Sequence, residues 1–211
     1  MYKQVSNQSF INPLDSSSLI NRQLLGLKEV IHITSTMSYL ASGGNSQVLA
    51  INSRRVAKVF QGEEEYQWAL KEYTYLCIAH SLAPGLYPKP YSLEQVGEET
   101  WHVVMERLYP LEPRAISRKE KEYAIALMYE QWYILHSVLA NWDISRMTDI
   151  GGGKWDNVLL CSTKQGLRIK FIDMGNAKLV GHRLFERAKC DDLIALEEYA
   201  SLLLKGMLPQ A

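Results

Sequence analysis

The chain has 211 residues, 47% of them hydrophobic, and its 23 basic residues balance its 23 acidic residues. This length suits one domain, or two small lobes that share a cleft. The balanced charge excludes the one-signed field that holds nucleic acid or an anionic membrane, so we expect neither as a partner. No apolar run approaches the roughly 20 residues that span a membrane. The first residues do not show the basic start and apolar region of a secretory signal peptide, so we do not expect export by the Sec pathway.

Residues 1–25 differ in composition from the rest of the chain. Ser, Asn and Gln supply eleven of these residues, and charged residues are sparse. Such a segment buries too little apolar surface to order itself. We therefore expect a disordered polar tail, which is either a flexible terminus or a secretion signal that is not cleaved.

The following segment predicts an antiparallel sheet with one helix. Apolar runs at residues 30–34, 48–51 and 56–60 are separated by turn-prone Gly, Asn and Ser residues, as in a strand meander. Three acidic residues then open a predicted helix over residues 63–81, where they favour the helix macrodipole. Three prolines break the chain after this helix, and residues 101–105 predict a further strand.

The second half of the chain predicts mostly helix. Residues 118–140 and 191–204 carry apolar side chains at helical spacing, and residues 158–160 and 169–172 predict two short strands between them. The predicted apolar positions of the first helix are Tyr123, Ala126, Leu127, Tyr133, Ile134 and Val138. The fold class is therefore α+β, with a β-rich first half and a helical second half.

Four separated segments carry residues suited to binding phosphate and metal. They are Leu40–Val48 followed by Val56-Ala57-Lys58, Val103–Leu108, Trp155–Leu160, and Phe171–Lys178 with Asp173-Met174-Gly175 inside it. In this order they resemble the signature set of the protein kinases, and the resemblance covers residues 37 to 204. It implies a minimal bilobal protein-kinase-like fold that binds ATP and Mg²⁺ between the lobes.

The resemblance assigns Mg²⁺ to Asp173 and Asn157. Asp173 occupies the position of the Asp in the family's Asp-Phe-Gly motif, with Met174 in place of Phe, and hard cations prefer such oxygen ligands. Asn157 lies sixteen residues upstream, where the family places the ligand of a second magnesium ion. The alternative for Asn157 is an Asx turn that caps the following strand.

The general base has three candidates. In the family pattern the catalytic Asp lies five residues before the Asn, but Gly152 occupies that position here. Asp149 is our first choice, because Asp149-Ile150 resembles the Asp-Leu pair of the catalytic loop with a glycine-rich extension behind it. Asp143 is the second choice and Asp156 the third, and the His and Arg expected before the base are absent.

The phosphate-covering loop of the family resembles Leu40–Val48. Of the three glycines in the family pattern only the middle one, Gly43, is present. Small residues at Gly43, Gly44 and Ser46 would still let backbone N–H groups approach phosphate, and Val48 would cover the adenine.

Lys58 resembles the lysine that pairs with the α- and β-phosphates and needs a carboxylate partner on the next helix. We expect that partner to be Glu72, with Glu65 as the alternate. Taken without the other segments, Lys58 is typical of a solvent-exposed lysine on a strand. Glu72 and Glu65 are each typical of a solvent-exposed helix face.

The segment Val103–Leu108 resembles the hinge between the lobes. Met105 would guard the back of the adenine pocket, and backbone groups of Glu106 and Leu108 would bind the adenine edge. These assignments predict an N-lobe over residues 26–107 and a truncated C-lobe over residues 108–211.

The short second lobe points to one kinase group. Asp192-Leu193-Ile194 resembles the start of the helix that supports the catalytic loop, but the usual activation segment and Ala-Pro-Glu motif are missing. The chain is similar to the minimal effector kinases that plant-associated bacteria deliver by type III secretion, including the Hop-type effector that phosphorylates the host Hsp-ninety chaperone. The resemblance implies a monomeric Ser/Thr protein kinase that acts in the host cytoplasm on a host protein.

Two other function classes remain open. A small-molecule kinase would share the catalytic core, but it usually carries a larger helical lobe that encloses the substrate. A pseudokinase or client mimic would bind partners without catalysis, and the poorly matched base favours it.

Overall fold

The computed structural model describes residues 37–42, 46–144 and 157–207. All of them belong to one compact unit that begins at Met37. The polar tail over residues 1–25 and the strand predicted at 30–34 lie outside the described residues. None of the helices in the described ranges combines the length and the apolar character needed to cross a membrane.

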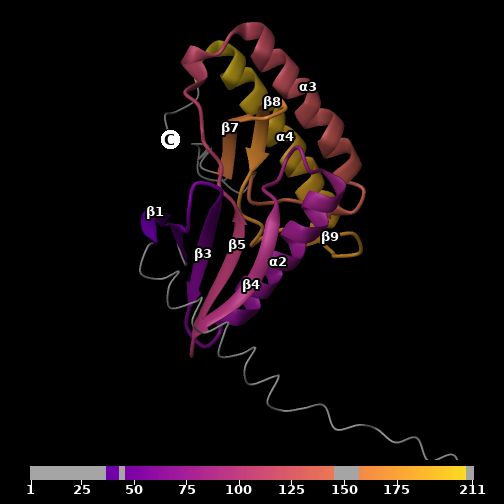
Figure 1. The fold of residues 1–211 in the computed structure, drawn as a ribbon. Coiled ribbons are helices and arrows are strands. Elements are labelled where there is room, and N and C mark those ends of the chain that lie inside the picture. The colour runs from indigo at the N-terminus through magenta and orange to yellow at the C-terminus, as the bar shows by residue number, and fades with distance from the viewer. Residues whose placement is uncertain (1–36, 43–45, 145–156, 208–211) are drawn as a thin grey trace, which may run out of the picture. The chain divides into compact units, whose positions relative to one another are not determined.

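A five-stranded antiparallel sheet forms the first half of this unit (Figure 1). Its strands are β1 (Ser38–Ser42), β2 (Gln47–Ala50), β3 (Arg55–Gln61), β4 (Pro90–Gly97) and β5 (Thr100–Glu106). Their order across the sheet is β1-β2-β3-β5-β4, so β3 and β5 lie at its centre. The apolar runs predicted at 48–51, 56–60 and 101–105 fall on β2, β3 and β5.

The edge strand β4 was not expected from the sequence, because prolines precede and open it. Pro90 is the first residue of β4, and β4 lies at the edge of the sheet. Proline lacks a backbone N–H and is tolerated at the start of an edge strand, where no ladder bond is lost. The proline cluster therefore breaks the chain before β4 without preventing the strand.

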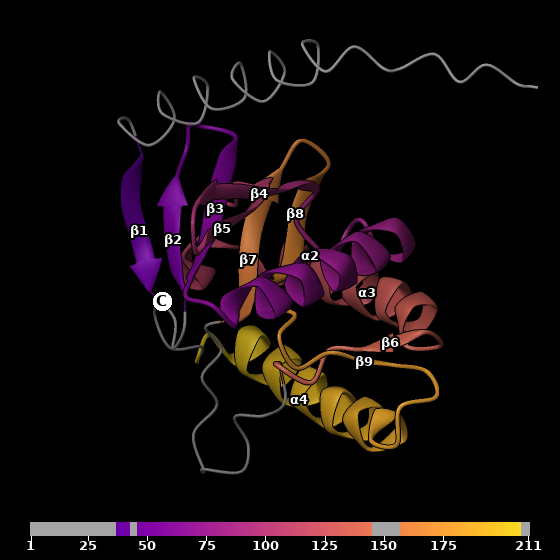
Figure 2. The same ribbon diagram turned by 90° about the horizontal axis from the view of Figure 1, so that it is seen from below.

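Helix α2 (Glu65–Leu82) packs across one face of the sheet, as Figure 2 shows. It begins two residues later than the predicted acidic start. Its buried residues are Ala69, Glu72, Leu76 and Ala79, which share one helix face. Burying the charge of Glu72 in this apolar stripe costs free energy unless the carboxylate is paired.

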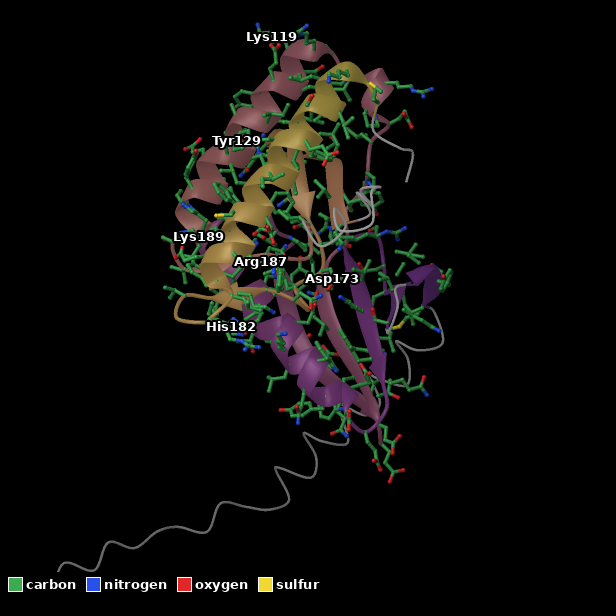
Figure 3. The ribbon with its side chains drawn as sticks, turned by 180° about the vertical axis from the view of Figure 1, so that it is seen from behind. Lys119, Tyr129, Asp173, His182, Arg187 and Lys189 are labelled. Atoms are coloured by element: carbon green, nitrogen blue, oxygen red, sulfur yellow. The ribbon has the colours of Figure 1, made fainter. Side chains whose placement is uncertain are left out.

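The second half contains α3 (Arg118–Leu135), the hairpin of β7 (Val158–Thr163) and β8 (Gly166–Phe171), and α4 (Phe185–Lys205). Two short strands, β6 (Leu139–Ala140) and β9 (Lys178–Leu179), pair with each other. Helices α3 and α4 lie side by side (Figures 1 and 3). A short 3₁₀ helix, Pro113–Ala115, precedes α3.

The buried face of α3 differs from the predicted one. Tyr123, Tyr133 and Ile134 were expected in the core but are 57%, 59% and 50% exposed. The apolar residues that α3 does bury are Ala124, Met128, Trp132 and Leu135. These four residues repeat every three or four positions, so they form a regular stripe on one helix face. The predicted set instead included large apolar residues that face solvent.

Helix α4 begins six residues before its predicted start at Asp191. Phe185 and Ala188 are 4% and 0% exposed and pack with Ala140 of β6 in a small satellite core. This contact extends the helix toward the short segment that follows Asp173. The helix ends at Lys205 and is capped by Gly206, whose φ of 69° lies in the left-handed region that glycine adopts easily.

Candidate active site

Lys58 lies at the centre of the sheet and holds two carboxylates. On β3 it pairs with Val48 of β2 and Val103 of β5, and its own side chain is 12% exposed. The ammonium Nζ lies 3.2 Å from Glu72 Oε1 and 3.0 Å from Asp173 Oδ1. Burial lowers the pKa of Lys58, but the charges of Glu72 and Asp173 outweigh it and raise the pKa above its usual value. The lysine therefore stays charged.

Glu72 connects α2 to the chain just after Asp173. Its Oε1 pairs with Lys58, and its Oε2 accepts a hydrogen bond of 3.0 Å from the Met174 N–H. Burial raises the pKa of Glu72 to about 7 and the charge of Asp173 adds to this, while Lys58 and the Met174 N–H act in the opposite direction. Glu72 is thus the carboxylate beside Lys58. The alternate partner, Glu65, lies at the first residue of α2 and forms no ion pair with Lys58 in the described structure.

Asp173 has an unusual backbone conformation. Its φ is 73°, and among the described residues other than glycine it alone has a positive φ. Such a conformation costs free energy and is found disproportionately at functional sites. Burial raises the pKa of the Asp173 carboxyl, but Lys58 and the Gly175 N–H, which donates to Oδ1 at 3.1 Å, hold it below its usual value. Figure 3 shows Asp173 where the strands of the first half meet the helices of the second.

Asp143 is a second carboxylate at the same place. Its Oδ2 accepts from the Asn176 N–H and its Oδ1 from Asn176 Nδ2, both at 2.6 Å. Burial raises the pKa of Asp143, and the charge of Asp173 raises it further against the opposing hydrogen bonds. A Cβ atom placed on Gly175 would lie 3.4 Å from Asp173 Oδ1 and 4.0 Å from Asp143 Oδ2, so the two carboxylates face one small space.

Asn157 completes this group. Its Nδ2 donates to the Asp143 carbonyl at 3.2 Å, which directs the side chain toward the same place and leaves Oδ1 without a donor in the described structure. The three side chains offer the oxygen atoms that Mg²⁺ prefers. No group of three or more His, Cys, Asp or Glu side chains suited to a metal occurs in the described ranges, so a metal here would need the amide oxygen of Asn157 beside a carboxylate.

The other predicted site residues are placed less completely. Gly43, Gly44, Asp149 and Asp156 lie outside the described residues. Ser46 immediately precedes β2, and Val48 on that strand is partly buried opposite Lys58. The structure thus brings together Lys58, Glu72, Asp143, Asn157 and Asp173, with Val48 on the neighbouring strand.

The predicted hinge, Val103–Leu108, covers the last four residues of β5 and the two residues that follow it. Met105 is 8% exposed and packs in the main core. The Glu106 N–H donates to the Lys89 carbonyl at 2.8 Å, so Glu106 can offer adenine only its carbonyl. The Leu108 N–H has no acceptor in the described structure. The residues on both sides of the boundary predicted near 107 belong to the same compact unit.

Two residues of the site were missed in the sequence. Asn176 binds the Asp143 carboxylate through both its backbone and its side chain. Lys71 Nζ donates to the Gly175 carbonyl, which ties α2 a second time to the segment after Asp173. The proximity of Asn176 to Asp173 in the sequence was the one available signal, whereas nothing in the helical pattern marks Lys71.

Asp192, predicted to support the catalytic loop, is fully buried in α4. Next to it, Asp191 Oδ2 accepts a hydrogen bond of 3.0 Å from the indole of Trp142 and lies 3.5 Å from the Arg187 guanidinium. These contacts attach α4 to the residue that precedes Asp143.

Comparison with known proteins gives a match among the solved structures. No protein-family model and no curated protein matches the chain. A solved structure, the Rio2 kinase–ADP/Mg²⁺–phosphoaspartate complex from Chaetomium thermophilum, matches with a TM-score of 0.53 and 14% sequence identity. The match covers 84% of this chain.

The chain has a protein-kinase-like fold. This confirms the predicted α+β class with an antiparallel sheet, one helix beside it, and a helical second half. The match covers only 59% of the Rio2 chain, so this chain spans less than two thirds of that neighbour. In the kinase-like fold, the cluster around Lys58 lies between the sheet-bearing half and the helical half.

Proposed function

We propose that the protein is an ATP- and Mg²⁺-dependent phosphotransferase. The observation that carries this proposal is Lys58 Nζ within 3.2 Å of Glu72 and 3.0 Å of Asp173, two carboxylates from different halves of the fold. A charged lysine next to metal-binding oxygen atoms suits a phosphate chain, because phosphoryl transfer depends on positioning and on neutralising negative charge.

Each side chain of the cluster has a role in this proposal. Asp173 and Asn157 would hold Mg²⁺, which when bound neutralises the charge of the phosphates. Lys58, held by Glu72, would bind the α- and β-phosphates. Asp143 would accept the proton of the attacking hydroxyl, since its raised pKa brings it closer to the value of an effective base.

The finer proposal is a Ser/Thr protein kinase that a bacterium secretes through a type III system into the host cytoplasm. The resemblance to minimal effector kinases supports it, as do the polar residues 1–25 and the short segment 174–184 before α4. A monomer acting on a host protein, with the Hsp-ninety chaperone as the candidate target, follows from the same resemblance. The short segment argues against docking of a linear peptide as in larger kinases.

A transfer assay tests the proposed activity. The purified chain is incubated with labelled ATP, Mg²⁺ and a panel of host proteins that includes the chaperone, beside Asp173→Ala and Lys58→Met variants. We expect label on a protein with the wild-type chain and a loss of about 100-fold or more in both variants. Transfer that is unchanged in Asp173→Ala would refute the assigned site.

Nucleotide binding separates the rival functions. ATP with Mg²⁺ should raise the melting temperature of the wild-type chain, and Asp173→Ala should remove the magnesium-dependent part. Binding without transfer to any protein, but with transfer to a metabolite, would indicate a small-molecule kinase. Binding to the chaperone without any transfer would indicate a client mimic.

A further inference from the structure

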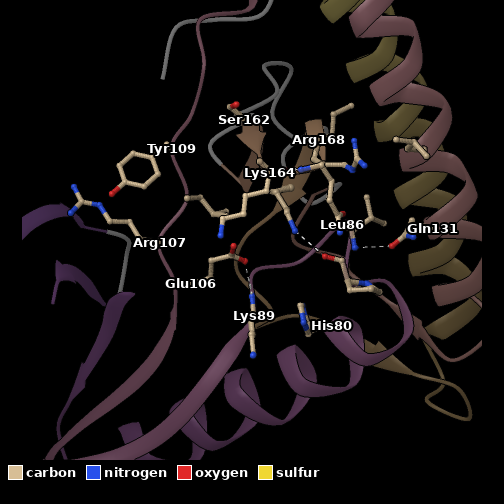
Figure 4. Close-up of a pocket in the computed structure, with 18 of the residues that line it drawn as sticks. His80, Leu86, Lys89, Glu106, Arg107, Tyr109, Gln131, Ser162, Lys164 and Arg168 are labelled. Atoms are coloured by element: carbon tan, nitrogen blue, oxygen red, sulfur yellow. Dashed lines mark hydrogen bonds between the residues drawn. The ribbon is translucent and has the colours of Figure 1, made fainter. Parts of the chain in front are cut away.

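A cavity of about 660 Å³ lies behind the predicted hinge, apart from the Lys58 cluster (Figure 4). Its walls come from both halves of the fold: the end of α2, β4, the segment after β5, α3, and the β7–β8 hairpin. None of Lys58, Glu72, Asp143, Asn157 or Asp173 lines it. Its volume is that of a site for a small molecule.

Positive charge dominates the lining. The cationic residues are Arg54, Lys89, Arg107, Lys164, Arg168 and Lys170. Against them stands a single carboxylate, Glu106, which accepts a hydrogen bond of 3.1 Å from the backbone N–H of Lys89. None of the six cations forms an ion pair with a carboxylate in the described part of the chain.

Lys170 is the buried member of this group. It is 5% exposed, and its ammonium donates to the carbonyls of Pro84 at 2.9 Å and Tyr87 at 3.0 Å. An ammonium has three N–H groups, so one remains without an acceptor in the described structure. Burial lowers the pKa of Lys170; Glu106 opposes this shift and Arg168 adds to it. An uncompensated buried cation costs free energy that an anion in the cavity would recover.

Lys164, in the turn of the β7–β8 hairpin, and Arg168, two residues before Lys170 on β8, line the same cavity. Figure 4 shows Lys164 above Glu106, while Arg107 and Tyr109 lie at the outer rim, where the Arg107 guanidinium is 5.2 Å from the Tyr109 ring centre. One nitrogen of Arg168 donates to the neighbouring Leu167 carbonyl at 2.8 Å. The remaining donors of its guanidinium have no partner in the described structure, and a guanidinium suits the oxygen atoms of a phosphoryl group.

We propose that this cavity binds a small molecule that carries at least two phosphoryl groups. Each phosphoryl group carries about −1.5 to −2 charges at pH 7, so two of them would offset most of the excess of six cations over one carboxylate. Lys164, Arg168 and Lys170 would bind the phosphoryl oxygens from the hairpin side, and Gln131 of α3 lies opposite with its oxygen already accepting from the Gly85 N–H at 2.8 Å. The bound molecule would contact residues from both halves of the fold.

Calorimetric titration tests this site, without Mg²⁺, with two probes: inorganic tripolyphosphate and a hexose bisphosphate. We expect saturable binding of at least one probe, weakened about tenfold or more in the Lys164→Ala/Arg168→Ala double variant. Lys170→Met should weaken binding to a similar degree, with the melting curve checking that this variant is folded. Preference for one probe identifies whether an organic scaffold contributes.

The matched control removes one lysine and one arginine elsewhere. Arg183→Ala/Lys205→Ala changes net charge equally at two exposed positions that do not line the cavity, and should leave binding unchanged. Lys58→Met should also leave it unchanged. The proposal is overturned if neither probe binds saturably, if the control double variant weakens binding equally, or if Lys58→Met alone abolishes it. Glu106 and Leu108 of the predicted hinge line the cavity, but none of the five residues of the Lys58 cluster does, so failure here leaves the proposed phosphotransfer untouched.

Discussion

Lys58 owes its position to two carboxylates that approach it from opposite halves of the chain. Glu72 comes from the helix beside the sheet and Asp173 from the segment after β8, and both lie within 3.2 Å of the ammonium. Each carboxylate also accepts a backbone N–H, from Met174 and Gly175 respectively. The fixed geometry therefore rests on side chain and backbone together, and losing one partner would leave a buried charge poorly compensated.

At the residue scale, the identity of the general base can be tested directly. We predict that Asp143→Asn lowers the turnover rate about 100-fold or more, because a base acts on the acceptor hydroxyl, while nucleotide binding changes little. Initial rates and nucleotide titrations of the same preparations measure the two effects. Asp149→Asn is the comparison: an active Asp143→Asn beside an inactive Asp149→Asn would return the role to Asp149.

At the element scale, α3 shows how periodicity can mislead. The sequence predicted the helix itself, and Ser117 caps its start by accepting from the Glu120 N–H while Glu120 binds the Ser117 N–H in return. The face it buries was predicted wrongly, since both faces carry large apolar residues. Packing against β8, α4 and α2 decides between the two faces.

This difference gives a direct test by stability. Met128 is 1% exposed and Ile134 is 50% exposed on the same helix. Met128→Ala should lower the free energy of unfolding by about 2–5 kcal/mol through lost burial and a new cavity. Ile134→Ala should stay within about 0.5 kcal/mol of the wild type. Denaturant unfolding of both variants measures this, and equal losses would contradict the assigned core face.

Much of the site could be predicted because its residues follow recognisable strands and turns. Lys58 lies in an apolar strand, Asp173 follows another strand by two residues, and Glu72 was predicted from its spacing of fourteen residues after Lys58. Asn176 and Lys71 could not be predicted, because their contacts depend on how the segment after Asp173 folds back onto Asp143 and α2. Strand β4 could not be predicted because it begins with Pro90. A proline is tolerated there only because the strand lies at the edge of the sheet.

At the scale of the whole molecule, the unit that begins at Met37 contains the Lys58 cluster. Every described contact of this cluster lies within that unit. We predict that a chain lacking residues 1–25 keeps the phosphotransfer rate of the full chain in the purified system and loses delivery into host cells. Parallel rate measurements check the unchanged phosphotransfer rate, and a delivery assay checks the loss of delivery. Lost catalysis in the shortened chain would make these residues part of the enzyme.

The double attachment of α2 bears on how the proposed enzyme would be controlled. Glu72 accepts a hydrogen bond from the Met174 N–H, and Lys71 donates one to the Gly175 carbonyl. Two neighbouring residues of α2 therefore hold the backbone of the segment that follows Asp173. Lys58, Glu72 and Asp173 are already joined by ion pairs in the described structure, so we expect the proposed enzyme to need no activator to bring these three side chains together. Its activity would then be limited by its amount and its lifetime rather than by a signal.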